Sequence, residues 1–180
     1  MAHKTATTLA MKGRLADALV ELLAEKPFAK ISIGEMAERA GVNRSTFYRN
    51  FDGKGQVVEF YIERIMRDWM ADYQKQPDHS AYNYLFTIYD ALYAKKRELL
   101  LLYDNDVAYY FLPVLNRMFA EHLDKGDPNV LELYRRYLAV GGIYNFIMLW
   151  LERGMAEPPH QVAAIGVLCY PDNEMPKYLD

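Results

Sequence analysis

The sequence predicts an all-α protein with a small three-helix head and a larger helical body. Apolar residues recur with helical period along almost the whole chain, and no segment shows the alternation typical of a β-strand. Two short helices joined by a tight turn are predicted close to the N-terminus. At 180 residues the chain can bury a core without a metal or a disulfide. We expect a head over residues 1–54, a body over 55–170 and a loose tail over 171–180.

The first helix of the head carries an apolar stripe and ends near Glu25, because Pro27 follows. The stripe has the spacing of one helix face and consists of Leu15, Leu19, Leu22 and Leu23. A second helix begins at Ser32, and Glu35 stands three residues later in the spacing of a capping box. Gly41 ends this helix.

Asn43 is a favourable N-cap for the third helix of the head. Phe47 and Phe51 lie four residues apart in this segment, so both can face inward against the first two helices.

The body is predicted to consist of further helices. A long helix over 54–74 buries one face, and the helices that follow end at turn-forming residues or prolines. The expected ranges are 54–74, 80–102, 107–123, 129–153 and 159–169, with Pro113 as a kink or start. The buried face of the long helix consists of Val58, Tyr61, Ile62, Ile65, Trp69 and Tyr73.

Charge is unevenly distributed between head and body. Residues 1–54 carry nine Lys and Arg against six Asp and Glu, whereas residues 55–180 carry twelve against eighteen. A basic head on an acidic body is typical of a protein whose head alone meets a polyanion.

The third helix of the head presents side chains suited to DNA. If Phe47 and Phe51 face inward, two guanidinium groups, two hydroxyl groups and an amide face outward. Guanidinium groups bind phosphates or guanine edges, and an amide can pair with adenine. The outward residues are Arg44, Ser45, Tyr48, Arg49 and Asn50, and Lys54 follows at the start of the next helix. The sequence therefore predicts a helix-turn-helix that enters a major groove of double-stranded DNA.

Residues 33–42, residues 43–51 and Lys54 together resemble the DNA-binding region of the TetR family of bacterial transcription regulators. The resemblance extends over about residues 10–56. It implies that Arg44, Ser45, Thr46, Tyr48, Arg49 and Asn50 occupy recognition-helix positions and that Lys54 binds a phosphate. Three residues depart from the family pattern: Asn50 stands where histidine is frequent, Gly55 where an acidic residue is usual, and Gly34 where a larger residue is usual.

The family resemblance implies a homodimer that binds a palindromic operator and is released by a small-molecule effector. A repressor is the expected mode. An activator, or a regulator-like binding module that acts through a protein partner, is the alternative. Residues 134–154 are similar to the C-terminal region of the branch that includes dihydroxyacetone-kinase regulators.

A dimer interface is expected on the last two helices. Gly141 and Gly142 are costly within a helix, at about 1 kcal/mol each relative to alanine, and they permit close approach of another backbone. A buried core helix is the alternative interpretation. The interface residues we expect are Ile143, Ile147, Trp150, Val162 and Ile165.

The middle of the body is rich in tyrosine, a residue that lines ligand pockets with an apolar ring and a hydroxyl. An effector pocket and an ordinary tyrosine-rich core are both consistent with this composition. The wall of the expected pocket consists of Tyr89, Tyr93, Tyr110, Arg117, His122, Tyr137 and Asn145.

Enzymatic chemistry is not expected. Two of the three serines lie in the head, and the third is expected to cap a helix. Cys169 has only one histidine near it in sequence, so an activated nucleophile is not expected. The four histidines show no metal-ligand spacing, and no phosphate-binding glycine loop is present. We therefore expect no cofactor and no metal. The sequence shows neither a signal peptide nor a membrane-spanning segment. We therefore expect a cytoplasmic protein that is associated with the nucleoid when it is bound to DNA.

Overall fold

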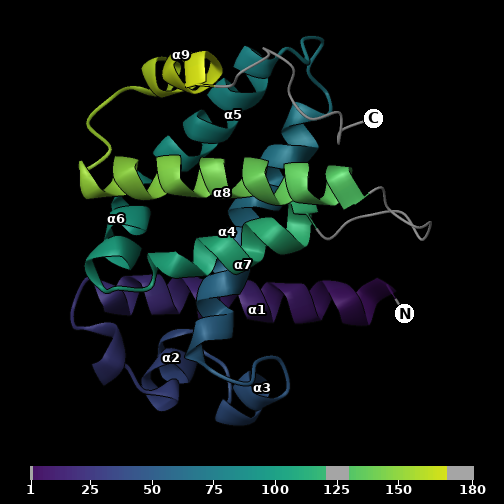
Figure 1. Ribbon diagram of the computed structural model, residues 1–180. Helices are drawn as coiled ribbons and strands as arrows, with labels where there is room; N and C mark the ends of the chain where they lie inside the picture. Colours follow the sequence, from purple (N-terminus) through teal and green to yellow (C-terminus); the bar gives the residue numbers. More distant parts are fainter. Residues whose placement is uncertain (1, 121–129, 170–180) are drawn as a thin grey trace. The chain divides into compact units, whose positions relative to one another are not determined.

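The computed structural model describes residues 2–120 and 130–169, and every regular element in these ranges is a helix (Figure 1). The predicted all-α class is confirmed. The chain divides into two compact units. The head unit comprises residues 1–64 and 97–110, and the body unit comprises residues 65–96 and the chain from residue 111 onward. The expected tail over 171–180 lies outside the described residues.

The head unit contains the helices expected near the N-terminus and a later segment that was assigned to the body. Its elements are α1 (Ala2–Leu23), η1 (Phe28–Lys30), α2 (Ile33–Arg39), α3 (Arg44–Tyr48), the first part of α4 (Lys54–Tyr73), most of α6 (Lys96–Asp104) and η2 (Ala108–Tyr110). The predicted apolar stripe of α1 is confirmed, since Leu15 and Leu19 are fully buried and Leu22 and Leu23 nearly so. The predicted inner face of α4 is buried as well.

The turn between α2 and α3 follows the expected local chemistry. The Ser32 hydroxyl accepts a hydrogen bond from the Glu35 backbone N–H, and the Ser32 N–H donates to the Glu35 carboxylate, which confirms the capping box. Gly41 adopts a positive φ of 61° and ends α2. Nη2 of Arg14 on α1 donates to the Gly41 carbonyl at 3.1 Å, so this turn is held against α1.

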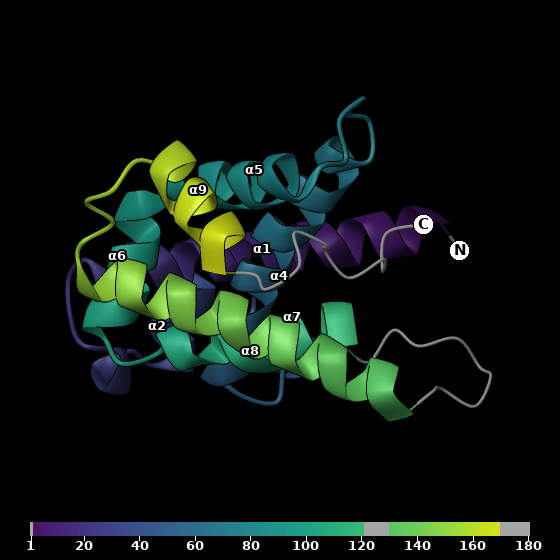
Figure 2. The same cartoon turned by 45° about the horizontal axis from the view of Figure 1, so that its top comes forward.

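The body unit contains the second part of α4 and the later helices. They are α5 (Ala81–Tyr93), α7 (Phe111–Leu115), the π-helical turn η3 (Asn116–Ala120), α8 (Val130–Glu152) and α9 (Pro159–Cys169). Helix α9 lies along α5 (Figures 1 and 2). Gly166 permits this contact, because a Cβ at that position would stand 2.8 Å from Leu85 Cδ1.

The prediction of one helix over 80–102 is wrong. Helix α5 ends at Tyr93, two turn residues follow, and α6 begins at Lys96. Nζ of Lys96 donates to the Met155 carbonyl at 2.9 Å, a contact distant in sequence that favours this break. Because the apolar residues continue with nearly the same period on both sides of the turn, the sequence pattern alone does not reveal it.

The conformation of Gly41 yields a stability prediction. Gly41→Ala is expected to lower the free energy of unfolding by about 1–2 kcal/mol, because a Cβ is strained at positive φ. That Cβ would also meet Arg14 Nη2 at 2.6 Å. Urea denaturation measures the change. Gly53→Ala is the matched control, since a Cβ there meets nothing within 4 Å; equal effects of the two substitutions would contradict the prediction.

Candidate nucleic-acid interface

Helix α3 is anchored by one buried aromatic side chain. Phe47 has no exposed surface, and its ring lies 5.8 Å from that of Phe51, which is also buried. The inward direction predicted for both rings is therefore confirmed. Lys12 of α1 places its ammonium group 5.1 Å from the centre of the Phe51 ring. These contacts fix the orientation of α3 and so determine which side chains face solvent.

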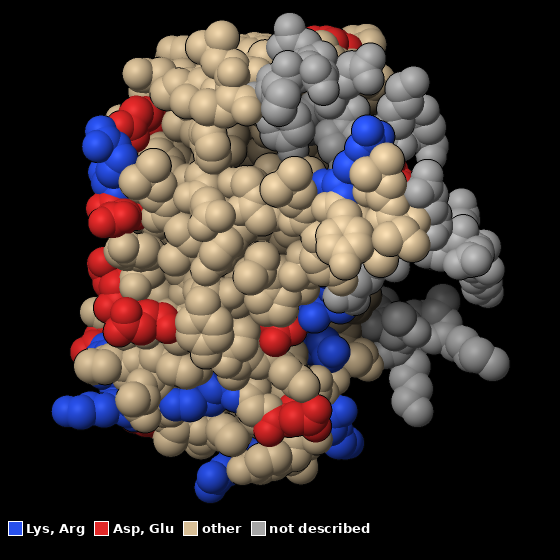
Figure 3. All heavy atoms as spheres, in the orientation of Figure 1, with Lys and Arg blue, Asp and Glu red and all other residues tan. Residues whose placement is uncertain are grey.

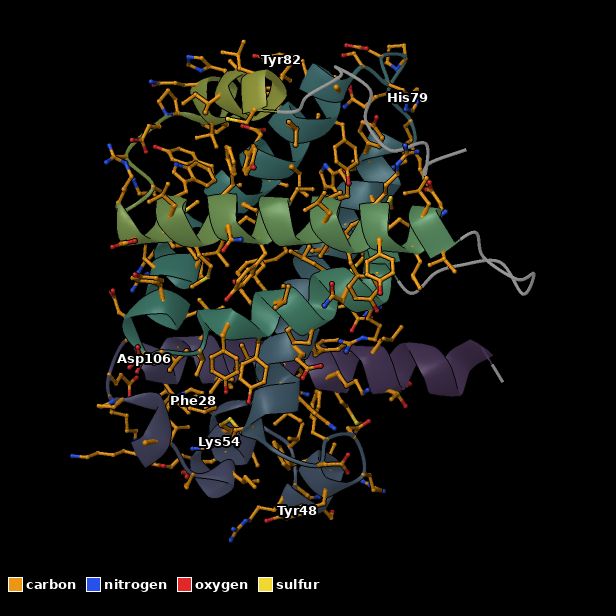
Figure 4. All side chains as sticks on the ribbon, viewed as in Figure 1. Phe28, Tyr48, Lys54, His79, Tyr82 and Asp106 are labelled. Carbon is orange, nitrogen blue, oxygen red and sulfur yellow. The ribbon has the colours of Figure 1, made fainter. Side chains whose placement is uncertain are left out.

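The outward side of α3 carries most of the residues expected to meet DNA. Arg44, Ser45 and Arg49 are exposed, and Tyr48 has 59% of its surface accessible. Tyr48 lies at the edge of the head unit, away from Phe28 and Lys54 (Figure 4). Lys and Arg side chains gather over this end of the unit (Figure 3). The exposed set combines two fixed positive charges with two hydroxyl groups, which suits a phosphate backbone and base edges.

Thr46 and Asn50 support this surface from behind. Thr46, which the resemblance places among the recognition-helix positions, is 5% exposed, so its hydroxyl does not lie on the outward face of α3. Its Oγ1 accepts a hydrogen bond from Arg49 Nη2 at 3.2 Å. Asn50 is half-buried and donates from Nδ2 to the Thr46 carbonyl at 2.6 Å. Thr46 thus orients the guanidinium group of Arg49.

Arg44 lies beside the start of α2. A Cβ at Gly34 would stand 3.8 Å from the guanidinium carbon of Arg44. This is an ordinary van der Waals distance, so the residue at position 34 lies next to the Arg44 side chain.

Lys54 has a structural position that the sequence did not reveal. Its Nζ donates to the carbonyls of Phe28 and Ile31, both at 2.7 Å, and stands 4.6 Å from the centre of the Phe28 ring. Figure 4 shows Lys54 and Phe28 side by side. Burial lowers the pKa of the Lys54 ammonium group. Two of its three N–H donors are used inside the head, so its first role is to hold η1 against the start of α4.

The segment 97–110 contacts the same part of the head unit. Oδ1 of Asn105 accepts a hydrogen bond from the Phe28 backbone N–H at 2.9 Å. A Cβ at Gly55 would stand 2.1 Å from the hydroxyl oxygen of Tyr110, so only glycine fits there with Tyr110 in place. Hydrogen bonding with Tyr109, together with burial, raises the pKa of Tyr110 to about 12. The sequence pattern placed Asn105 only between the helices expected over 80–102 and 107–123.

The residues expected to line a pocket are divided between the two units. Tyr110 belongs to the head unit, where it contacts Gly55. Tyr89 is buried, and Tyr93 stacks on Trp150 with ring centres 5.9 Å apart. Tyr137 and Asn145 are exposed, Arg117 is half-buried, and His122 lies outside the described residues.

The expected dimer residues fall into two groups. Ile147, Trp150 and Val162 are 1%, 3% and 6% exposed, so the chain's own core buries them and they do not form an outer surface. Ile143 is half-buried, and Ile165 is 42% exposed. The sequence showed that α8 is apolar on nearly every side but did not show which side faces outward.

Within 2–120 and 130–169, no three His, Cys, Asp or Glu side chains are grouped so as to hold a metal ion. No helix in this part of the chain combines the length and the apolar character that crossing a membrane requires.

A buried three-helix core with an exposed, basic third helix defines the class of helix-turn-helix DNA-binding proteins. Residues 15–59 match the family model of bacterial regulatory proteins of the tetR family. This part of the chain is therefore similar to the DNA-binding domain of that family. No curated protein sequence matches the chain.

Solved structures show the same fold. A TetR transcriptional regulator from Streptococcus agalactiae 2603V has a TM-score of 0.57 and 16% identity, over 93% of this chain and 97% of that one. One from Rhodococcus sp. RHA1 has a TM-score of 0.56 and 18% identity, over 89% and 97%. The fatty acid degradation regulator FadR from Bacillus halodurans has a TM-score of 0.52 and 16% identity, over 91% and 97%. The resemblance to the dihydroxyacetone-kinase regulator branch stays a prediction.

Removal of the Lys54 ammonium group is expected to destabilise the head. Lys54→Ala leaves the carbonyls of Phe28 and Ile31 without this donor, and hydrogen bonds to charged groups contribute about 1.5–3 kcal/mol each. We expect a loss of roughly 2 kcal/mol in the free energy of unfolding, measured by denaturant titration. Lys30→Ala removes an exposed lysine from the same turn and serves as the control. A loss no larger than that of the control would contradict the structural role.

Acid is expected to weaken the α2 cap. Hydrogen bonds from Lys26 and Ser32 lower the pKa of Glu35 from 4.5 to about 2. Because the folded-state pKa is depressed, the stabilisation is complete above the unfolded value and is lost as the pH falls toward 2. Melting temperature measured between pH 5 and pH 2 should fall less steeply for Glu35→Gln than for the unaltered chain. Identical slopes would show that Glu35 titrates normally.

Proposed function

We propose that the chain is a homodimeric transcriptional repressor that binds a palindromic operator and is released from it by a small-molecule effector. The observation that carries the proposal is the outward set on α3, namely Arg44, Ser45, Tyr48 and Arg49, fixed by the buried Phe47. One helix of five residues can contact only a short stretch of DNA sequence. Two such helices, placed in successive major grooves by a dimer, read an inverted repeat.

The effector would release the protein from its operator by acting through residues 97–110, the later segment of the head unit. Asn105 and Tyr110 lie against η1 and the start of α4, where Lys54 is also bound. An effector that favours another arrangement of residues 97–110 would shift the population of head positions. The spacing of the two recognition helices would then no longer match the operator.

We propose that the effector is a small molecule that is at least partly apolar. Two aromatic clusters in the body unit support this: Tyr89 and Tyr93 on Trp150, and Tyr73 and Tyr84 on Trp69. Structural neighbours concerned with fatty acid degradation or n-alkane biodegradation share the fold at 15–16% identity, which does not transfer their ligands.

An activator, or a module that acts through a protein partner, is the second candidate. The partner-binding module is disfavoured by Arg44 and Arg49, which expose two positive charges on the outward side of the head.

Selection of bound sequences from random duplex DNA tests the proposal. The selection should recover an inverted repeat. When it is repeated at a higher salt concentration, the affinity of the protein for this DNA should fall steeply, because contacts with phosphates release counterions. Recovery of no sequence even at low salt would exclude operator binding.

Substitution on the outward face of α3 should separate DNA binding from folding. Arg44→Ala and Arg49→Ala are each expected to lower operator affinity by about 1–3 kcal/mol, the range of a base or phosphate contact. The melting temperature and the dimer should be nearly unchanged, because both side chains are exposed. Lys95→Ala on the body unit removes one exposed cation and is the matched control for affinity, measured by fluorescence anisotropy. Equal loss of stability and affinity would show that these arginines are structural.

The effector can be sought by intrinsic fluorescence, because both tryptophans, Trp69 and Trp150, belong to the body unit and are buried. A compound that binds among the aromatic clusters is expected to change the emission and to weaken operator binding at the same concentrations. Trp69→Phe and Trp150→Phe identify the cluster concerned. A compound that changes emission without affecting operator binding would not be the effector.

A further inference from the structure

Thr46 is a polar residue of α3 that the head unit buries. A buried hydroxyl group requires a hydrogen-bond partner, and the partner of this one is a side chain that reaches the surface. The Thr46 Oγ1 accepts a hydrogen bond from Arg49 Nη2 at 3.2 Å, and Arg49 is exposed. Thr46 therefore holds an exposed cation from the inner side of the helix.

The carbonyl oxygen of Thr46 is bound by a second side chain. The backbone N–H of Asn50 donates to the Phe47 carbonyl at 2.9 Å, whereas the Asn50 side chain donates from Nδ2 to the Thr46 carbonyl at 2.6 Å. This side-chain hydrogen bond supplies a donor to one of the last carbonyls of α3. The amide that could pair with adenine is therefore engaged in closing the end of the helix.

The two exposed arginines of this region stand at opposite ends of α3. Arg44 is the first residue of the helix, and Arg49 follows its last residue. When a recognition helix lies in the major groove, residues in its N-terminal part contact the base edges. The opposite end of the helix is then nearer to the phosphate backbone, where contacts position the protein without reading sequence.

The two arginines also differ in how the protein holds them. A Cβ at Gly34 would stand 3.8 Å from the guanidinium carbon of Arg44, and such a van der Waals contact sets no direction. The hydrogen bond between Arg49 and Thr46 does set a direction. Ordering a long side chain on binding costs conformational entropy. The contact with Thr46 lowers that cost for Arg49, because its guanidinium group is oriented before DNA arrives.

We propose that Thr46 is a positioning residue that acts on DNA through Arg49, that Arg49 binds a phosphate, and that Arg44 contacts the base edges. Thr46 makes no contact with DNA in this arrangement. Its hydroxyl orients the guanidinium group of Arg49, and its carbonyl, bound by Asn50, fixes the backbone from which Arg49 projects. One N–H group of Arg49 is used by Thr46, and the others remain for phosphate oxygens. The assignment rests on the DNA binding of the proposed function and gives the two arginines separate tasks.

A double-mutant cycle on DNA affinity tests the positioning role. Thr46→Val removes the hydroxyl, retains the branched shape and strands no buried donor, because Arg49 is exposed. Binding to a fluorescein-labelled duplex of mixed sequence, measured by anisotropy, should weaken by about fivefold. Arg49→Ala should weaken it by about tenfold, and the double variant should bind no worse than Arg49→Ala alone. Thr46→Ser retains the hydroxyl and is the matched control, with affinity equal to that of the unaltered chain.

Asn50→Ala provides a second test that leaves the buried residue unaltered. It removes the hydrogen bond to the Thr46 carbonyl, so it should weaken DNA binding in the presence of Arg49 and have no further effect in the Arg49→Ala background. Melting temperatures measured on the same proteins show whether each variant is folded. Effects that multiply in both double variants would overturn the positioning role, because Thr46 and Asn50 would then act on DNA independently of Arg49.

Salt dependence tests the division of tasks between the two arginines. Arg49→Ala should reduce the slope of log affinity against log salt concentration by about one, because one phosphate contact is lost. It should also weaken binding to the selected inverted repeat and to the mixed-sequence duplex equally. Arg44→Ala should weaken binding to the inverted repeat about tenfold more than binding to the mixed sequence. The reverse pattern, or the same behaviour of both variants, would overturn the assignment.

The outcomes separate the positioning role from the proposed function on which it rests. Non-additive effects of Thr46→Val and Arg49→Ala, together with the expected salt slopes, support the proposal. A chain that binds an inverted repeat but shows additive effects overturns the positioning role alone. A folded chain that binds neither a selected sequence nor the mixed-sequence duplex at low salt overturns the proposed function as well.

Discussion

The arrangement of the head depends on the ammonium group of Lys54. A cation at the first residue of α4 is opposed by the helix dipole, so its presence there requires a compensating interaction. The carbonyls of Phe28 and Ile31 supply it at 2.7 Å. Because η1 joins α1 to α2, this contact fixes the connection between the first two helices and the start of α4. The orientation of α3 follows, since its Phe47 is buried in the core that these helices form.

Local chemistry allowed much of the head to be predicted from the sequence. The Ser32 and Glu35 cap, the stop at Gly41 and the inward rings of Phe47 and Phe51 depend on residues close in the chain. The role of Lys54 could not be predicted, because its partners lie more than twenty residues away. The burial of Thr46 is also tertiary, since a short helix has two sides and the sequence did not show how far the core extends around it.

The body was less predictable because its helices are apolar on more than one side. Helix α8 buries Ile147 and Trp150 while exposing Leu138 and Leu149, and hydropathy does not distinguish these two faces. The expected pocket stays a prediction, and its residues are divided between the two units. Aromatic residues close in sequence were assigned to one cavity, but Tyr110 belongs to the head unit and Tyr89 to the body unit.

The division of the chain bears on the proposed release by an effector. The chain passes between the units within α4, within α6 and after Tyr110, so residues 97–110 are attached to the body at both ends. Two of their contacts with the rest of the head unit are specific: Oδ1 of Asn105 accepts a hydrogen bond from the Phe28 N–H, and the Tyr110 hydroxyl lies against Gly55. A larger residue at position 55 would exclude Tyr110 from this place. The glycine that departs from the family pattern at position 55 therefore leaves the space that the Tyr110 hydroxyl occupies within the head unit.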